Sequence, residues 1–363
     1  MSATAVEYVP EATEADSAWV EPPEIPTASS LETRELLKSR EFNPNIEPPP
    51  LRVIYSLAGI PISTPANIAT INAPIKAGKS AAIGAMAAST MPHAEDADLL
   101  GFASANETGE ALDWFDSEQS PDDFWFGVAR SLKRAGLTKP PPWFHAYCLT
   151  GLGAEKGWQA VLEALRMSSD QHGGIHSLLL DGAADFVKDV NDAGESNAFV
   201  ATLHDLAIQY DCPIIGVIHF NPGSEKSRGH LGSQLERKAE TNLALEKDED
   251  GSTVIYSAKN RRADIPKNIG PRFRFDTAVG MHVTIPSRQS ARDAAARAEL
   301  LCIAQDAFGK RPAMRYSDIQ VRLQKVLALK ERSAKRKIAD MKRLGVIKAS
   351  VAGLYLLCTP VES

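Results

Sequence analysis

Short apolar runs alternate with longer amphipathic segments between Leu51 and Ile285. The apolar runs are predicted to be strands, at 67–73, 111–116, 176–182, 213–220, 241–247, 253–259 and 272–276. Amphipathic segments separate the first four of these strands and are predicted to be helices, at 79–90, 121–136, 155–169 and 196–210. Apolar strands that alternate with helices are typical of a parallel sheet covered on both faces, whereas strands that follow one another directly are expected to be antiparallel. The pattern therefore predicts an α/β fold with a mainly parallel sheet.

The pattern changes at both ends of the chain. Segments 291–308, 316–327 and 331–345 have helical spacing, and 346–358 fits two short strands around an Ala-Gly turn, which together indicate a winged-helix domain. Residues 1–50 are acidic and rich in Pro, and we expect a mostly disordered tail in which 31–42 could form a short helix. The predicted organisation is a tail (1–50), an α/β domain (51–286) and a winged-helix domain (287–363).

Composition excludes several classes of protein. Apolar residues make up 44% and charged residues 24% of the 363 residues, which is ordinary for a soluble globular protein. No apolar run approaches the roughly 20 residues of a membrane-spanning helix. The first residues have neither the basic nor the apolar region of a secretory signal. The four cysteines are far apart, which fits neither a disulfide framework nor a zinc site. We therefore expect a cytoplasmic protein without a membrane partner.

The charge is distributed unevenly. Between Ser287 and Lys348 there are 16 Lys and Arg against 6 Asp and Glu, a local balance of +10, although the whole chain carries −6. The rest of the chain therefore carries −16. A basic module on an acidic protein indicates a polyanionic partner that contacts this one module.

The segment "APIKAGKS" lies between the predicted strand 67–73 and the predicted helix 79–90. Backbone N–H groups at such a strand-to-helix turn form an anion site, and G-x-x-x-x-G-K-[ST] is the phosphate-loop pattern that uses it. We expect Lys79 to reach the β- and γ-phosphates of ATP, Ser80 to bind Mg²⁺, and Gly78 to allow close backbone approach. The whole loop that would hold the nucleotide comprises Ala73, Pro74, Ile75, Lys76, Ala77, Gly78, Lys79 and Ser80. Ala73 stands where the pattern has glycine, so a decayed site and a chance match are alternatives, and an unstrained loop requires that Ala73 avoid a positive φ.

Three polar residues follow apolar strands and could complete this site. Asp181 ends the strand 176–182 and is expected to bind the metal together with Ser80, from a strand next to that of the loop. Glu118 follows the strand 111–116, which is expected to lie beside the loop and to place Glu118 as a base for the attacking water. His219 near the end of 213–220 is a candidate γ-phosphate sensor. The structural alternatives are a turn residue, an exposed glutamate and a hydrogen-bonded strand-end histidine.

The order of "APIKAGKS", "WFDSEQS", "LLLDG", "VIHFNPGSEKSRG" and "YSAKNRR" resembles the RecA-like ATPase superfamily. Within it, the chain looks most like RepA-type plasmid replicative helicases and their relatives on mobile elements, over about residues 51–276. The resemblance implies that Glu118 is the catalytic base and that His219 is the sensor. "SAKNRR" is similar to the K-x-R motif of hexameric helicases, which implies that Lys259 and Arg261 act on the ATP of a neighbouring subunit in a homo-oligomer, as in a hexamer. Arg262 adjoins the motif and leaves the finger open by one residue, and a basic turn is the alternative.

Two basic regions are candidates for DNA contact. The polar segment 221–234 follows the sensor strand, and the resemblance implies that Lys226 and Arg228 hold single-stranded DNA there. The third helix of the winged-helix pattern has an apolar stripe of Ala334, Ile338, Met341 and Leu344. Its outward residues are candidates for contact with duplex DNA: Arg332, Lys335, Arg336, Lys342 and Arg343. An ordinary mobile loop, a solvated basic helix and a protein-docking module are the alternatives.

Two functions remain in view. The first is an oligomeric, Mg²⁺-dependent ATP-hydrolysing DNA helicase or translocase of RepA type, which acts in the replication of a plasmid, phage or integrative element. The second is an ATP-controlled DNA-binding regulator, or a loader or scaffold, that does not unwind DNA. A metabolic P-loop kinase fits less well, because nothing resembles an acceptor-substrate lid and the basic module would be unexplained.

Overall fold

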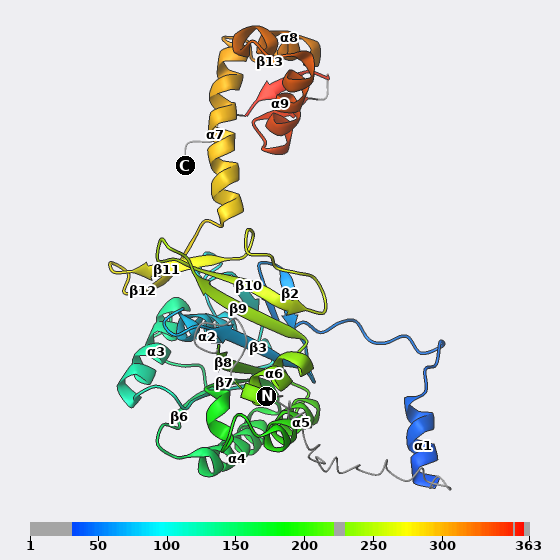
Figure 1. Cartoon of the computed structure of the whole chain (residues 1–363), viewed down its shortest axis with the longest axis vertical. Coiled ribbons are helices and arrows are strands. Elements are labelled where there is room, and N and C mark those ends of the chain that lie inside the picture. Colours follow the sequence, from blue (N-terminus) through cyan, green and yellow to red (C-terminus); the bar gives the residue numbers. More distant parts are fainter. Residues whose placement is uncertain (1–30, 221–228, 351–352, 359–363) are drawn as a thin grey trace, which may run out of the picture. The chain divides into compact units, whose positions relative to one another are not determined.

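The structure is a computed structural model that describes residues 31–220, 229–350 and 353–358 (Figure 1). The chain divides into one unit that ends at Pro50 and a second that begins at Leu51. In the first unit, the predicted short helix is present as α1 (Leu31–Arg40), and residues 32–50 are exposed. Residues 1–30 of the predicted tail lie outside the described residues.

A nine-stranded sheet organises the described part of the second unit, in the order β12-β11-β10-β9-β3-β8-β7-β5-β6. Neighbouring strands from β9 to β6 are parallel, and those from β9 to β12 are antiparallel. The predicted α/β class and the antiparallel end of the sheet are therefore confirmed. The strands are β3 (Ile68–Ala73), β5 (Ala111–Asp116), β6 (Phe144–Cys148), β7 (Ile175–Asp181), β8 (Ile214–His219), β9 (Thr241–Lys247), β10 (Thr253–Asn260), β11 (Arg272–Asp276) and β12 (Met281–Ile285).

Two expected strand positions were wrong. β8 lies between β3 and β7, so the strand of Asp181 is not next to the strand of the loop. β5 lies one place further away, beyond β7, and is not beside β3 either. The pattern of a sequence gives the order of strands along the chain, whereas helical crossovers decide their order across the sheet. The polar ends of these strands still meet, because the carboxyl ends of parallel strands share one edge.

Helices cover both faces of the sheet (Figure 1). Alternate residues of one strand point to opposite faces, so Leu179 packs into the cluster with α2 (Lys79–Ser89) and α3 (Pro121–Arg134), whereas Leu178 packs on the other side. That other side is covered by α4 (Ala154–His172), α5 (Ala193–Gln209) and α6 (Gly229–Lys238), and the short helix η1 (Ala183–Phe186) follows β7.

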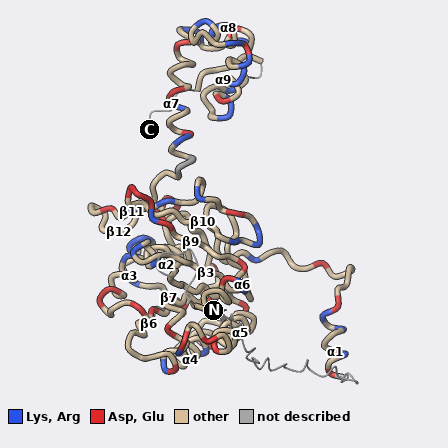
Figure 2. Tube along the Cα trace, viewed as in Figure 1, with Lys and Arg blue, Asp and Glu red and all other residues tan. Residues whose placement is uncertain are grey.

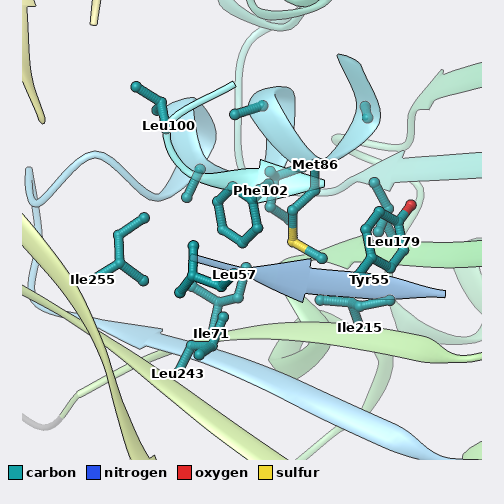
Figure 3. Packing of buried hydrophobic residues seen from close by; sticks show 14 of the residues in the cluster. Tyr55, Leu57, Ile71, Met86, Leu100, Phe102, Leu179, Ile215, Leu243 and Ile255 are labelled. Atoms are coloured by element: carbon teal, nitrogen blue, oxygen red, sulfur yellow. The ribbon is translucent and has the colours of Figure 1, made fainter. Parts of the chain in front are cut away.

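A small sheet that was not predicted joins the first cluster. It has the order β2-β1-β4 and consists of β1 (Tyr55–Leu57), β2 (Ile60–Ser63) and β4 (Phe102–Ser104). Figure 3 shows Leu57 and Phe102 of this sheet packed with Met86 of α2 over the central strands. Its strands have only three or four residues, which is too short for a clear apolar alternation. β6 also escaped prediction, because polar residues interrupt its five positions.

Residues 288–358 contain a separate buried cluster. The elements are α7 (Arg288–Phe308), β13 (Ala313–Met314), α8 (Tyr316–Leu327), α9 (Glu331–Arg343), β14 (Ile347–Ala349) and β15 (Tyr355–Leu357), and the strands pair in the order β13-β15-β14. The three predicted helices and the two-stranded hairpin are present, and β13 is an additional strand. Ala334, Ile338 and Met341 of α9 are buried as expected. Within the described ranges, no helix is both long enough and apolar enough to cross a membrane.

Candidate nucleotide-binding site

The loop after β3 is built without strain at the alanine that replaces glycine. Ala73 is fully buried as the last residue of β3, and its φ is not positive. Its carbonyl accepts a hydrogen bond from the backbone N–H of Phe220 at 3.3 Å. The positive φ values fall instead at Lys76 (64°) and Gly78 (89°). The condition set for an unstrained loop is therefore met, because alanine is acceptable wherever the backbone is extended.

Gly78 turns the loop into the first turn of α2. Its positive φ favours glycine, and a Cβ at this position would lie 2.7 Å from the Phe273 ring. Gly78 is also the N-cap of α2 and has no side chain to cap the helix. The first N–H groups of a helix have no partner within it, so those of Lys79 and Ser80 are suited to bind an anion.

Three predicted side chains meet at this loop. Lys79 Nζ lies 2.8 Å from Nδ1 and 2.6 Å from Nε2 of His219. His219 Nε2 lies 2.8 Å from Glu118 Oε2, and Lys79 Nζ is 3.6 Å from the same oxygen. Lys79 comes from α2, His219 from the end of β8 and Glu118 from the turn after β5. The structure thus brings together three residues that lie up to 140 positions apart in the chain.

The surroundings shift the proton affinities of two of these groups. Burial lowers the pKa of Lys79, and the nearby Glu118 and Asp181 only partly oppose this effect. Burial acts to raise the pKa of Glu118, but the hydrogen bond from His219 and the charge of Lys79 outweigh it, so the net pKa is lowered. Glu118 is therefore held as a carboxylate that can accept a proton.

Asp181 has the surroundings expected of a metal ligand. It is 2% exposed at the end of β7, and burial, followed by the charges of Asp116 and Glu118, raises its pKa to about 7. In the described part of the chain, no group donates a hydrogen bond to its carboxylate. A buried carboxylate without a donor is suited to a hard cation, for which oxygen ligands are preferred. Ser80 is half-buried at the start of α2, and its hydroxyl supplies a second oxygen of the kind that Mg²⁺ binds.

Asp116 was missed by the sequence analysis. It is fully buried, and its Oδ1 accepts hydrogen bonds from the backbone N–H groups of Glu118 (3.0 Å) and Gln119 (2.9 Å). The side chain of Gln119 also donates to Asp116. The neighbouring Ser117 donates to the Gly182 carbonyl at 3.1 Å, which joins the ends of β5 and β7. These bonds fix the turn that presents Glu118.

A cavity of about 340 Å³ opens beside the loop. Its walls combine loop residues with the α3 residues Arg130 and Arg134 and with His282 of β12. Arg134 donates to the His282 carbonyl at 2.7 Å and is 3.7 Å from the Asp98 carboxylate. Together with Lys76 and Lys79 these arginines give the cavity four cationic side chains, and none of its described lining residues is acidic. The cavity is therefore suited to an anionic ligand.

The predicted K-x-R pair lies at the other end of the sheet. Lys259 pairs with Asn242 of β9, which in turn is level with Thr70 of β3. The backbone N–H of Arg261 donates to Glu240 O, whose own N–H donates to Ile68 O. Arg261 is thus level with the start of β3, about 16 Å along the strand from the loop at its end. Arg261 and Arg262 are exposed and cannot reach the loop of their own chain.

The predicted DNA contacts have different outcomes. Lys226 and Arg228 lie outside the described residues. All five predicted residues of α9 are exposed, and basic positions recur along α8 and α9 (Figure 2). Three of them are engaged within the module, through Lys335–Glu331 at 2.6 Å, Arg343–Asp293 at 3.4 Å, and Lys342, which lies 4.4 Å from the Tyr355 ring centre. Arg332 and Arg336 have no ion-pair partner among the described residues.

No family model and no curated protein matches the chain. Among solved structures, the chain is similar to the crystal structure of the RadB recombinase, with 17% identity, a TM-score of 0.41, and coverage of 62% of this chain and 93% of that one. It is also similar to a solved ATPase domain of a helicase, with 12% identity, a TM-score of 0.43, and coverage of 61% and 86% respectively.

Proposed function

We propose that the chain is an ATPase with a RecA-like core that hydrolyses ATP bound at residues 73–80. The observation that carries this proposal is the meeting of Lys79, His219 and Glu118 at a helix N-terminus, beside the buried carboxylate of Asp181. A cation, a base and a metal-binding carboxylate around one anion site are the groups that phosphoryl transfer to water requires. The cationic cavity beside the loop gives further support.

Each residue has a defined task in this proposal. The ammonium of Lys79 and the first N–H groups of α2 bind the β- and γ-phosphates. Ser80 and Asp181 would hold Mg²⁺, which when bound supplies positive charge to the phosphate oxygens. Glu118, with its lowered pKa, accepts the proton of the attacking water. His219 contacts both Lys79 and Glu118, so its position can respond to the γ-phosphate and carry that response into the segment after β8.

The test is steady-state ATP hydrolysis by the wild type, Lys79→Ala and Glu118→Gln. Lys79→Ala should lose nucleotide binding, whereas Glu118→Gln should keep it and lose at least about 10²-fold in kcat, because only the proton acceptor is removed. Hydrolysis at the wild-type rate by Lys79→Ala would refute the proposal. Lys156→Gln, an exposed lysine of α4, is the matched control for loss of a lysine charge.

For the biological role, we propose a DNA helicase or translocase of RepA type in the replication of a plasmid, phage or integrative element. The chain would act as a homo-oligomer, with a hexamer as the expected form, and would bind single-stranded DNA. The position of Arg261 supports this, because it lies too far from its own loop to act anywhere but on a neighbour. Mixing inactive Lys79→Ala subunits with inactive Arg261→Ala subunits should restore hydrolysis, since some sites then combine an intact loop with an intact arginine. No restoration would refute catalysis between subunits.

A second function is favoured by one observation. Residues 288–358 have their own buried cluster and expose Arg332 and Arg336, which fits a winged-helix domain that binds duplex DNA in a regulator or loader. A fork-unwinding assay with ATP separates the two functions. Strand separation supports the helicase, whereas DNA-stimulated hydrolysis without strand separation supports the regulator or loader.

A further inference from the structure

Helix α6 is attached to the ATPase core at three places. At its start, Leu231 N–H donates to Val190 O at 3.0 Å, in the segment after η1. Further along, Glu236 Oε1 accepts a hydrogen bond from Asn72 Nδ2 at 3.1 Å, and Asn72 immediately precedes Ala73 at the phosphate loop. Its end is held by Lys259 of β10. The helix therefore connects the strand of the loop with the strand that carries the K-x-R pair.

The ammonium of Lys259 is fully used at the end of α6. Its Nζ donates to three backbone carbonyls, those of Glu236 at 3.0 Å, Arg237 at 3.0 Å and Ala239 at 2.7 Å. An ammonium has three donors, and the last carbonyls of a helix have no partner within the helix. Lys259 could bind a phosphate only by leaving these carbonyls. Burial, followed by the charge of Arg261, lowers the pKa of Lys259.

Arg261 has a different environment. One guanidinium nitrogen, Nη2, donates to Lys238 O at 3.2 Å, and the side chain is otherwise exposed to solvent. A guanidinium has five N–H donors, so most of them can reach an incoming oxyanion while this one bond fixes the direction of the side chain. The same helix end thus engages both residues, but it fully occupies only Lys259.

We propose that the two residues of the K-x-R motif have separate roles, in which Lys259 is a positioning residue that caps α6 and Arg261 alone acts on the phosphate of a neighbouring subunit. This inference rests on the proposed ATPase function. Because Glu236 bonds to Asn72 through its side chain and to Lys259 through its carbonyl, α6 links the loop of one chain to the arginine that this chain presents to the next.

The test combines hydrogen exchange with hydrolysis on the full chain. In the protein without nucleotide, Lys259→Met should speed amide exchange at the end of α6 about tenfold or more, because three helix carbonyls lose their donor. Arg261→Ala should leave this exchange unchanged while kcat falls by about 10³-fold or more. A residue that only contacted the neighbour's phosphate could not alter exchange in the absence of nucleotide.

Lys259→Gln keeps the proposal testable if the methionine variant does not fold. Glutamine is neutral but retains N–H donors for the carbonyls, so a cap should keep kcat within about tenfold of the wild type, and a lost phosphate contact should reduce it as far as Arg261→Ala does. Unchanged exchange at α6 together with such a reduction would overturn the assignment of Lys259. No hydrolysis by the wild type would refute the ATPase function and the role of Arg261, whatever the exchange shows.

Discussion

Replacing Ala73 by the glycine of the phosphate-loop pattern should harm the protein rather than improve it. Ala73 is fully buried, belongs to β3 and has no positive φ, so glycine offers no conformational advantage there. Ala73→Gly removes a buried methyl group, at about 0.8 kcal/mol. It also adds the entropic cost of glycine in a strand, about 0.5–1 kcal/mol. We expect the free energy of unfolding to fall by about 1–2 kcal/mol, with ATP affinity unchanged.

Urea unfolding, followed by the fluorescence of tryptophans such as the buried Trp114, measures the first quantity, and titration with a fluorescent ATP analogue measures the second. Ala69→Gly is the matched control, because Ala69 lies on the same strand, is 5% exposed and is remote from the loop. Both variants should lose similar stability. A gain in ATP affinity with Ala73→Gly, or a stability equal to that of the wild type, would show that the loop is strained at this position and that our account of it is wrong.

Two further predictions concern charge. Because the folded-state pKa of Asp181, about 7, lies above its ordinary value, its protonated form stabilises the fold, and this contribution disappears as pH rises through about 7. In a chelator, Asp181→Asn should therefore gain stability relative to the wild type between about pH 5 and pH 8 in urea unfolding, and a constant difference would contradict the pKa. In the C-terminal module, replacing both Arg332 and Arg336 by Ala should weaken duplex binding and reduce the slope of log K against log salt by about 2, whereas Lys335→Ala, which loses an ion-paired residue, should have less effect. Equal effects would indicate that the ion pair opens on binding.

Much of the site could be predicted because its residues directly follow apolar runs. Glu118, Asp181 and His219 each come at or just after the end of a buried strand, where a polar residue stands out in the sequence. The sheet order could not be predicted, since no local pattern states which strand lies between which others. The strand of Asp181 was therefore placed wrongly although its carboxylate was found.

Other members of the site leave weaker signals. Asp116 precedes Glu118 by two positions and reads as the last residue of a strand, so nothing marks it as the residue that holds the turn. Arg134 lies in the last turn of an amphipathic helix, where basic residues are ordinary. The partners of Lys259 are backbone carbonyls about 20 residues away in the chain, and carbonyls have no sequence signature.

The opposite placement of the loop and Arg261 limits the symmetry of any assembly that uses both. A two-fold dimer pairs one surface patch with itself, but these two features lie at opposite ends of the parallel strands and belong to different patches. Subunits must then pack head to tail, which is a heterologous contact. Such an assembly either closes by rotation or leaves one unpaired loop and one unpaired arginine at its ends. In an open chain of subunits, hydrolysis per subunit should rise with length towards a plateau, and only closure would complete every site.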